Sequence, residues 1–98
     1  MNRIPYEERA KIYAKAAETF GHDLQVTVAI EEMSELTKEL CKNKRLEGHL
    51  IRVAEEIADV TIMMEQLRNL YGVNELVCSF MDGKVTRLAG RVQKEAEA

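Results

Sequence analysis

The sequence contains little that would build a β-sheet. It has one proline, no tryptophan and only 5% aromatic residues. No stretch alternates apolar and polar residues as a half-buried strand does, and no Asn-Gly or Asp-Gly turn separates two apolar runs. Leu, Ala, Glu, Lys, Met and Arg dominate instead, and these residues favour helices. We therefore predict an all-α protein.

Long apolar runs and an excess of positive charge are also missing. The uninterrupted apolar runs are too short to span a bilayer. A net charge of −3 gives no global attraction to nucleic acid or to an anionic membrane surface. Cys41 and Cys78 lie far apart and lack the Cys-x-x-Cys spacing of metal sites. We expect free thiols in a reducing, cytoplasmic environment.

Apolar residues recur at spacings of three and four in four segments, which is typical of amphipathic helices. Glycine or a polar capping residue stands at most of the expected boundaries. The expected helices run from Pro5 to Thr19 (stopped by Gly21), from Asp23 (as the N-cap) to Lys42, from His49 to Tyr71 (stopped by Gly72), and onward from Asn74 (as a cap).

The length of 98 residues indicates a single domain, spanning residues 1–98. Short connections make consecutive helices antiparallel neighbours, so the predicted fold is four-helix-bundle-like. A domain of this size buries only a modest part of its surface. We therefore expect oligomerisation to complete the bundle.

Two pairs of acidic residues occupy helix faces that should be apolar. At about 100° per residue, Glu56 falls inside the apolar stripe of its helix, and Asp59 follows one turn later. Glu32 and Glu35 repeat this spacing on the preceding helix. Carboxylates about 5 Å apart repel by roughly 3 kcal/mol at an effective dielectric near 20, so a cation would stabilise them. Oxygen ligands favour Mg²⁺, with Mn²⁺ as a substitute, and all four residues are predicted metal ligands.

Lys or Arg side chains from a neighbouring helix are the alternative partners of these acids. Glu31 and Glu55 precede the two pairs and point further toward solvent, but they remain within reach of a metal. Glu39, one turn beyond Glu35, is expected to be a charge on the helix face. No Glu is followed three residues later by His, so the Glu-x-x-His pattern of di-iron bundles is missing.

Basic residues follow one side of the last predicted helix. Lys84, Arg87 and Arg91 are spaced by three and then by four residues. Such a stripe suits phosphate oxygens, with Arg acting as a fork and Lys as a point charge. A solvated face, or ion pairs with the acidic residues, would explain it equally simply. Lys38 and Lys42 on the second helix are weaker candidates for phosphate binding.

Residues 31–36 (Glu-Glu-Met-Ser-Glu-Leu) and 55–60 (Glu-Glu-Ile-Ala-Asp-Val) resemble the paired Glu-x-x-Glu and Glu-x-x-Asp signature of the MazG-like all-α NTP pyrophosphatases. The basic stripe resembles a segment found in the last helix of that superfamily. The resemblance covers roughly residues 26–92. It implies a helical bundle assembled as a homodimer or homotetramer. The implied reaction is Mg²⁺-dependent cleavage of a nucleoside triphosphate between the α and β phosphates, giving monophosphate and pyrophosphate.

The resemblance also implies a role for each matching residue. The metal ligands would be the two acidic pairs, and the catalytic candidates, one of which would orient or deprotonate water, are Glu31, Glu32 and Glu56. Phosphate would be bound by Lys84 and Arg87, with Arg91 and Lys38 as further candidates. The base pocket would come from the first helix and a partner chain, with a stacking residue among Tyr6, Tyr13, Phe20, Tyr71 and Phe80.

The sequence is also compatible with two other functions. A phosphoribosyl-ATP pyrophosphatase would use the same metal site on a different substrate. A non-catalytic helical module would instead oligomerise or bind a partner helix through methionines at helical spacing. Acids at the core edge argue against such a module, because an interaction surface has no need of them.

Overall fold

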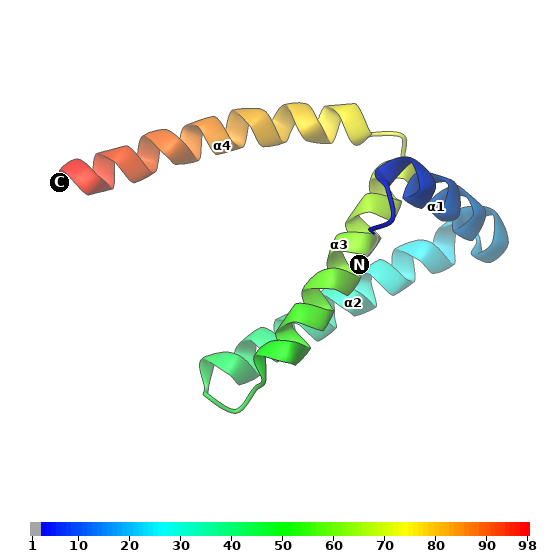
Figure 1. The fold of residues 1–98 in the computed structure, drawn as a ribbon, viewed down its shortest axis with the longest axis horizontal. Helices are drawn as coiled ribbons and strands as arrows, with labels where there is room; N and C mark the ends of the chain where they lie inside the picture. Colours follow the sequence, from blue (N-terminus) through cyan, green and yellow to red (C-terminus); the bar gives the residue numbers. More distant parts are fainter. Residues whose placement is uncertain (1–2) are drawn as a thin grey trace.

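The computed structural model describes residues 3–98 and contains α-helices without any strand in that range. The helices are α1 (Tyr6–Phe20), α2 (His22–Lys44), α3 (Leu50–Leu70) and α4 (Asn74–Glu97) (Figure 1). The predicted all-α class is confirmed, and the expected boundaries are within two residues of those observed. The first two residues of the predicted domain lie outside the described part.

The helix ends follow the predicted glycines but not all of the predicted caps. Gly21 and Gly72 both have positive φ, at 86° and 64°, where L side chains are strained, and each follows the end of a helix. Asp23 was expected to cap the second helix, and this is wrong. That helix already begins at His22, directly after Gly21, and no side chain caps it. Asn74 is the first residue of α4 and likewise forms no side-chain cap.

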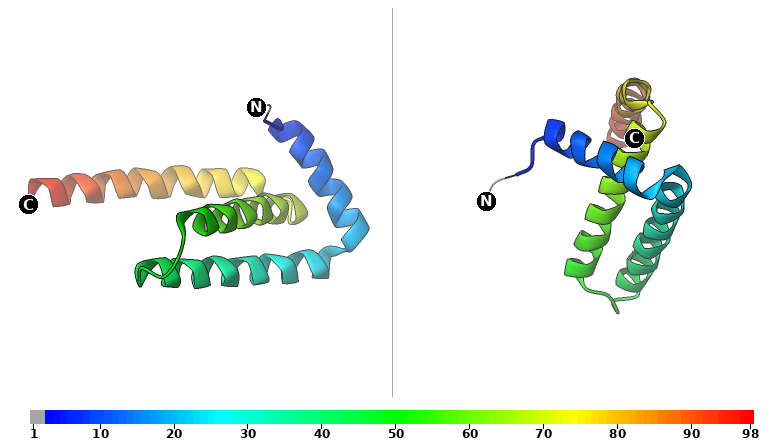
Figure 2. Two further views of the ribbon diagram at one scale, coloured as in Figure 1. Left: turned by 60° about the horizontal axis from the view of Figure 1, so that its bottom comes forward. Right: turned by 90° about the vertical axis from the view of Figure 1, so that its right-hand side faces the viewer.

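Helices α2 and α3 lie side by side and antiparallel, joined by the short loop 45–49 near the predicted position (Figures 1 and 2). Helix α1 crosses the end of this pair at which α2 begins and α3 ends, and it contacts both. These three helices form the packed body of the chain. The α2–α3 interface runs the length of that body.

Glu65 of α3 holds α1 against α3 through side-chain hydrogen bonds. Arg9 donates from Nε to Glu65 Oε1 at 3.1 Å and from Nη2 to Oε2 at 2.9 Å, while the Tyr13 hydroxyl donates to Oε1. The hydrogen bonds from Arg9 lower the pKa of the Glu65 carboxyl, and burial raises the pKa of Tyr13. No local sequence pattern predicts this link, because it joins residues more than 50 positions apart.

Helix α4 projects away from the body (Figures 1 and 2). It contacts α3 beside the connecting turn, where Arg68 Nη2 donates to Cys78 Sγ at 3.1 Å. It contains no buried residue, and most of its large apolar side chains are at least half exposed. A single chain therefore does not close the predicted four-helix bundle. The exposed apolar residues are Leu76, Phe80, Met81, Val85, Leu88 and Val92.

The apolar core is small. Among the described residues, Tyr13, Ala29 and Met63 are the buried hydrophobic side chains, and none of the large ones is completely enclosed. Gln25 and Glu39 are buried as well, although they are polar. In residues 3–98 no helix combines the length and apolar character needed to cross a lipid bilayer.

Candidate metal centre

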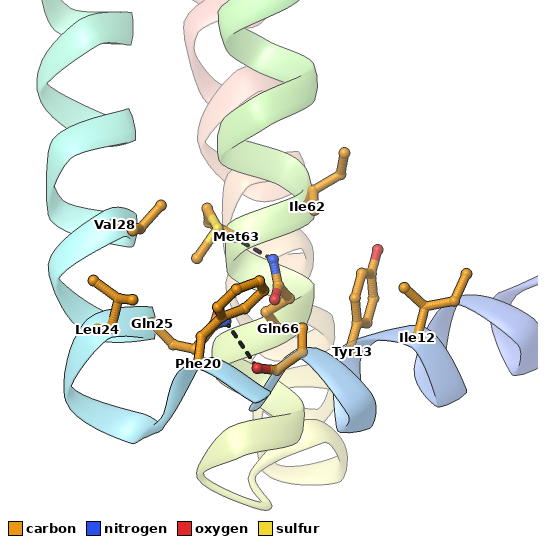
Figure 3. Close-up of a pocket in the computed structure, with 10 residues that line it drawn as sticks. Ile12, Tyr13, Phe20, Leu24, Gln25, Val28, Ile62, Met63 and Gln66 are labelled. Carbon is orange, nitrogen blue, oxygen red and sulfur yellow. Dashed lines mark hydrogen bonds between the residues drawn. The ribbon is translucent and has the colours of Figure 1, made fainter. Parts of the chain in front are cut away.

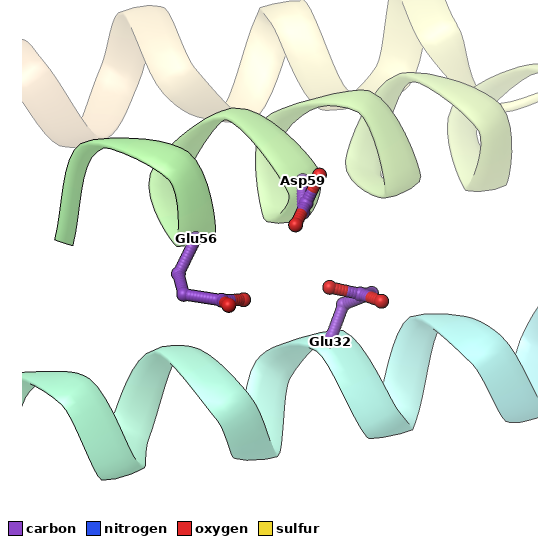
Figure 4. A group of neighbouring side chains, drawn as sticks. All are labelled: Glu32, Glu56 and Asp59. Carbon is purple, nitrogen blue, oxygen red and sulfur yellow. The ribbon is translucent and has the colours of Figure 1, made fainter. Parts of the chain in front are cut away.

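Three carboxylates meet at the α2–α3 interface. Glu32 projects from α2, and Glu56 and Asp59 project toward it from successive turns of α3 (Figure 4). One carboxylate oxygen from each residue lies within 4.8 Å of the others. We refer to these three residues as the carboxylate cluster. Their convergence follows from the three-residue spacing on α3 and the antiparallel packing of the two helices.

The carboxylate cluster is partly withdrawn from solvent, and its members disfavour each other's charge. Burial, followed by the charge of Asp59, raises the pKa of Glu56. The same two causes, in the same order, raise the pKa of Glu32, which also shares a hydrogen bond with Asp59. Glu56 Oε2 is inaccessible and accepts no hydrogen bond. The cluster therefore favours a bound proton or a bound cation.

No basic side chain in the described chain pairs with the carboxylate cluster. The ion pairs of residues 3–98 are Arg9–Glu65, Lys42–Glu39 and Arg45–Glu47, and none of them includes a member of the carboxylate cluster. Within one chain, neutralisation by Lys or Arg thus does not account for these acids. A small set of oxygen ligands without nitrogen or sulfur suits a hard divalent cation such as Mg²⁺.

Glu35 and Glu31 lie beside the carboxylate cluster. Glu35 is exposed, and its charge raises the pKa of both Glu32 and Glu56. Glu31 is exposed too, and its charge acts on Glu32. Of the four predicted metal ligands, three therefore converge in the structure and Glu35 flanks them.

Glu39 differs from its expected position. It was predicted to be a charge on the helix face, which is wrong, because only 6% of the residue is exposed. Its Oε1 lies 3.9 Å from Lys42 Nζ, and its Oε2 is inaccessible and has no hydrogen-bond partner. The sequence did hold a signal for this burial, since Glu39 follows Glu32 by seven residues and so shares its face.

The predicted phosphate-binding residues are not brought to the carboxylate cluster within one chain. Lys84, Arg87 and Arg91 are exposed on the projecting helix α4. None of them forms an ion pair with an acid of residues 3–98. Lys38 is also exposed, on α2. These four side chains are free to meet a ligand or another chain.

A mostly apolar pocket lies between α1, α2 and α3, with a volume of about 420 Å³ (Figure 3). It begins one helical turn from the carboxylate cluster, because Val28 precedes Glu32 by four residues and Met63 follows Asp59 by four. Phe20 and Tyr13, from the predicted aromatic set, line it together with Ile12, Ala16, Leu24, Gln25, Ile62 and Gln66.

Two glutamines give this pocket its polar groups, and sequence reasoning did not single them out. Gln25 Nε2 donates to the carbonyl oxygen of Ala16 at 3.4 Å, and Gln66 Nε2 donates to Met63 Sδ at 3.2 Å (Figure 3). Both contacts use one amide group and leave the side-chain carbonyl oxygens for another donor. Glutamines on separate helices carry no sequence pattern that would pair them.

Comparison of the chain with protein-family models, with curated proteins and with solved structures found no match.

Proposed function

We propose that this chain is a Mg²⁺-dependent nucleoside triphosphate pyrophosphohydrolase of the MazG-like type, which converts a ribo- or deoxyribonucleoside triphosphate into the monophosphate and pyrophosphate. The observation that carries the proposal is the carboxylate cluster of Glu32, Glu56 and Asp59, with which no Lys or Arg of residues 3–98 forms an ion pair. The paired acidic motifs of the sequence support the same conclusion.

In this proposal the carboxylate cluster holds the cation, and a carboxylate at the site accepts the proton of the attacking water. Mg²⁺ held there would neutralise phosphate charge and make a water molecule more acidic. The water oxygen forms a bond to the α-phosphorus, the bond to the bridging oxygen breaks, and pyrophosphate leaves with that oxygen. A neighbouring carboxylate accepts the proton of the water. Glu31, Glu32 and Glu56 are the candidates, and the one whose oxygen is not bound to the cation would take this role.

The apolar pocket supports a nucleotide substrate over a simple polyphosphate. It lies about one turn, roughly 5 Å along the helix axis, from the carboxylate cluster. A nucleotide whose phosphates reach the cluster would place its base in this pocket. Phe20 offers a flat apolar surface there, and the amides of Gln25 and Gln66 offer hydrogen bonds to the base edge.

We further propose that the active form is a homo-oligomer, a dimer or a pair of dimers, in which α4 of one chain packs on the body of another. The exposed apolar side chains of α4 would be buried there, which favours association. The charges are complementary, because α4 carries Lys84, Arg87 and Arg91 while the α2–α3 interface is acidic. Association would thus bring phosphate-binding side chains to the carboxylate cluster.

The experiment that tests the function is a panel of ribo- and deoxyribonucleoside triphosphates plus phosphoribosyl-ATP, with Mg²⁺ and with detection of pyrophosphate and monophosphate. Turnover of one or more triphosphates is expected. Turnover of phosphoribosyl-ATP alone would mean that the enzyme has this substrate instead, at the same metal site. No turnover on the whole panel would contradict the enzyme and favour a helical interaction module, which the exposed apolar side of α4 would serve.

A further inference from the structure

The apolar pocket between α1, α2 and α3 has few polar groups, and the one from Tyr13 is already in use. The Tyr13 hydroxyl donates its proton to Glu65 Oε1, and Arg9 holds the same carboxylate with two hydrogen bonds. The ring of Tyr13 is therefore fixed as a wall of the pocket, and its hydroxyl has no second proton for a ligand. The polar groups that remain for a ligand come from Gln25 and Gln66.

The side chain of Gln25 is held in one orientation by its own chain. The residue is only 8% exposed, and its Nε2 donates to the carbonyl oxygen of Ala16 at 3.4 Å. A backbone carbonyl oxygen can only accept, so the nitrogen end of the amide has to face it. Turning the amide over would place two oxygens against each other without a proton between them. The carbonyl oxygen Oε1 is thus the end of Gln25 that is left for a ligand.

Gln66 of α3 is oriented in the same way. Its Nε2 donates to Met63 Sδ at 3.2 Å (Figure 3), and a thioether sulfur, like a carbonyl oxygen, has no hydrogen to donate. The carbonyl oxygen of Gln66 is therefore left for a ligand as well. Because both glutamines line one pocket of about 420 Å³, a ligand bound there meets two hydrogen-bond acceptors on an otherwise apolar surface.

Two carbonyl oxygens in an apolar pocket favour a base with an exocyclic amino group. Such a group has two hydrogens and can donate one to each oxygen. An oxo group in the same position has none, and the adjacent ring N–H of an oxo base can serve only one of the two oxygens. The other oxygen would then lose its water without gaining a donor, which is costly in apolar surroundings. A site that hydrogen-bonds an amino group in this way discriminates against analogues that lack it.

We propose that the pocket selects nucleotides whose base carries an amino group on the edge remote from the sugar, as adenine and cytosine do, over their oxo counterparts hypoxanthine and uracil. Gln25 and Gln66 are the residues that determine this specificity. The inference rests on the proposed function, which places the base in this pocket, and it names the substrate class. Phe20 and Tyr13 offer their rings to any base, so they add affinity without this discrimination.

The test is isothermal titration of the intact protein, with Mg²⁺, using two matched pairs of monophosphates, CMP with UMP and AMP with IMP. The members of each pair differ in the amino or oxo group and in the ring hydrogen that accompanies the oxo group. Wild-type protein should bind the amino member at least about tenfold more tightly in both pairs, which is the effect of one unsatisfied acceptor in an apolar site. Monophosphates are not substrates of the proposed reaction, so the result does not depend on turnover.

Gln25→Met and Gln66→Met keep the length of the side chain and remove its polar atoms. Each should weaken the binding of CMP and AMP about tenfold and that of UMP and IMP by less than about threefold, because one acceptor suffices for the oxo bases. A general loss of packing would instead weaken both members of a pair equally. Gln93→Met, at an exposed position of α4, is the matched control and should keep the wild-type preference. Circular dichroism checks the fold, and Gln66→Met alone carries the test if the buried Gln25→Met does not fold.

Equal affinities within both pairs, or a preference that survives in the folded glutamine variants, would overturn the inference. Turnover of triphosphates in the same preparation would show that the proposed function stands without it. Tighter binding of CMP and AMP, lost in the glutamine variants but without turnover of any triphosphate, would support the inference and contradict the proposed reaction. If none of the four monophosphates bound, the pocket would not be a base site and the inference would be overturned.

Discussion

Glu32 on α2 and Asp59 on α3 face each other across the helix interface, and Asp59 raises the pKa of Glu32 through its charge and through a shared hydrogen bond. The two side chains come from segments that are far apart in the sequence and share one narrow space. A proton and the proposed metal ion would compete for that space. Stability and metal binding should therefore both depend on pH, and the direction follows from the raised pKa values.

Without metal, the folded protein should lose stability as the pH rises above the ordinary glutamate value of 4.5. The pKa of Glu56 is raised in the folded state, so that state binds the proton more tightly than the unfolded chain. The favourable protonated form is lost as the pH rises through the raised pKa. Glu56→Gln removes this loss, so its melting temperature in EDTA should exceed that of wild type by a margin that grows from pH 4.5 to 7. If the melting temperatures of the two proteins changed equally with pH, Glu56 would not be the group whose pKa folding raises.

Mg²⁺ should raise the melting temperature of wild-type protein, because an ion that binds only the folded state stabilises it. The gain is about 2.7 kcal/mol at a hundredfold excess over the dissociation constant. Asp59→Asn removes a proposed metal ligand, so its melting temperature should rise little at the same Mg²⁺ concentration. Differential scanning fluorimetry at pH 7 measures both, with Glu18→Gln, a change to an exposed acid on α1, as the control that keeps the wild-type response. An equal shift in Asp59→Asn would mean that Mg²⁺ binds elsewhere.

Glu65→Gln should destabilise the protein by weakening the link between α1 and α3. The variant keeps the shape of the side chain but loses the charge that Arg9 pairs with, so we expect a loss of about 1 kcal/mol, or about 4–8 °C in Tm. The pKa of Glu65 is lowered by folding, so its contribution is present above pH 4.5 and lost as the pH falls through the lowered pKa. The gap between the proteins should therefore close in acid. Tyr13→Phe, which removes only the hydroxyl, should cost less.

Phe80→Glu should dissociate the oligomer. The side chain is 59% exposed in the single chain and belongs to the apolar side of α4 that the partner would cover. A buried charge there would oppose association strongly. Sedimentation equilibrium should show an oligomer for wild type and a monomer for Phe80→Glu. Gln93→Glu, on the same helix but already polar, should remain oligomeric. A monomeric wild-type protein would contradict the proposed homo-oligomer.

Two inactive variants should complement each other if α4 of one chain serves the site of another. Glu56→Gln lacks a cluster residue, and Arg87→Ala lacks a proposed phosphate contact. After the two are mixed and allowed to exchange, half of the dimers carry one intact site. About a quarter of wild-type activity should return. Mixtures that stay as inactive as their components would place Arg87 and Glu56 in different sites or in the same chain's site.

The local features of this chain were readable from its sequence, and the long-range ones were not. Helix extents follow from residue preferences and glycine stops, and the convergence of Glu32, Glu56 and Asp59 follows from spacing on antiparallel helices. The projection of α4 depends on whether its apolar side finds a partner, which no periodicity encodes. The seven-residue offset between Glu32 and Glu39 is visible in the sequence. The burial of Glu39 was nevertheless missed, because a charge at the end of an acidic run usually faces solvent.

The proposed function requires the carboxylate cluster to bind a cation that drives pyrophosphate release. The most direct measurement is the rate of pyrophosphate release from a mixture of nucleoside triphosphates, for wild type and Glu56→Gln, with Mg²⁺ and with EDTA. We predict release by wild type with Mg²⁺ only, and a loss of at least about a hundredfold in Glu56→Gln at unchanged helix content. Equal rates in the two proteins, or wild-type release that continues in EDTA, would mean that a cation at the carboxylate cluster does not drive the reaction.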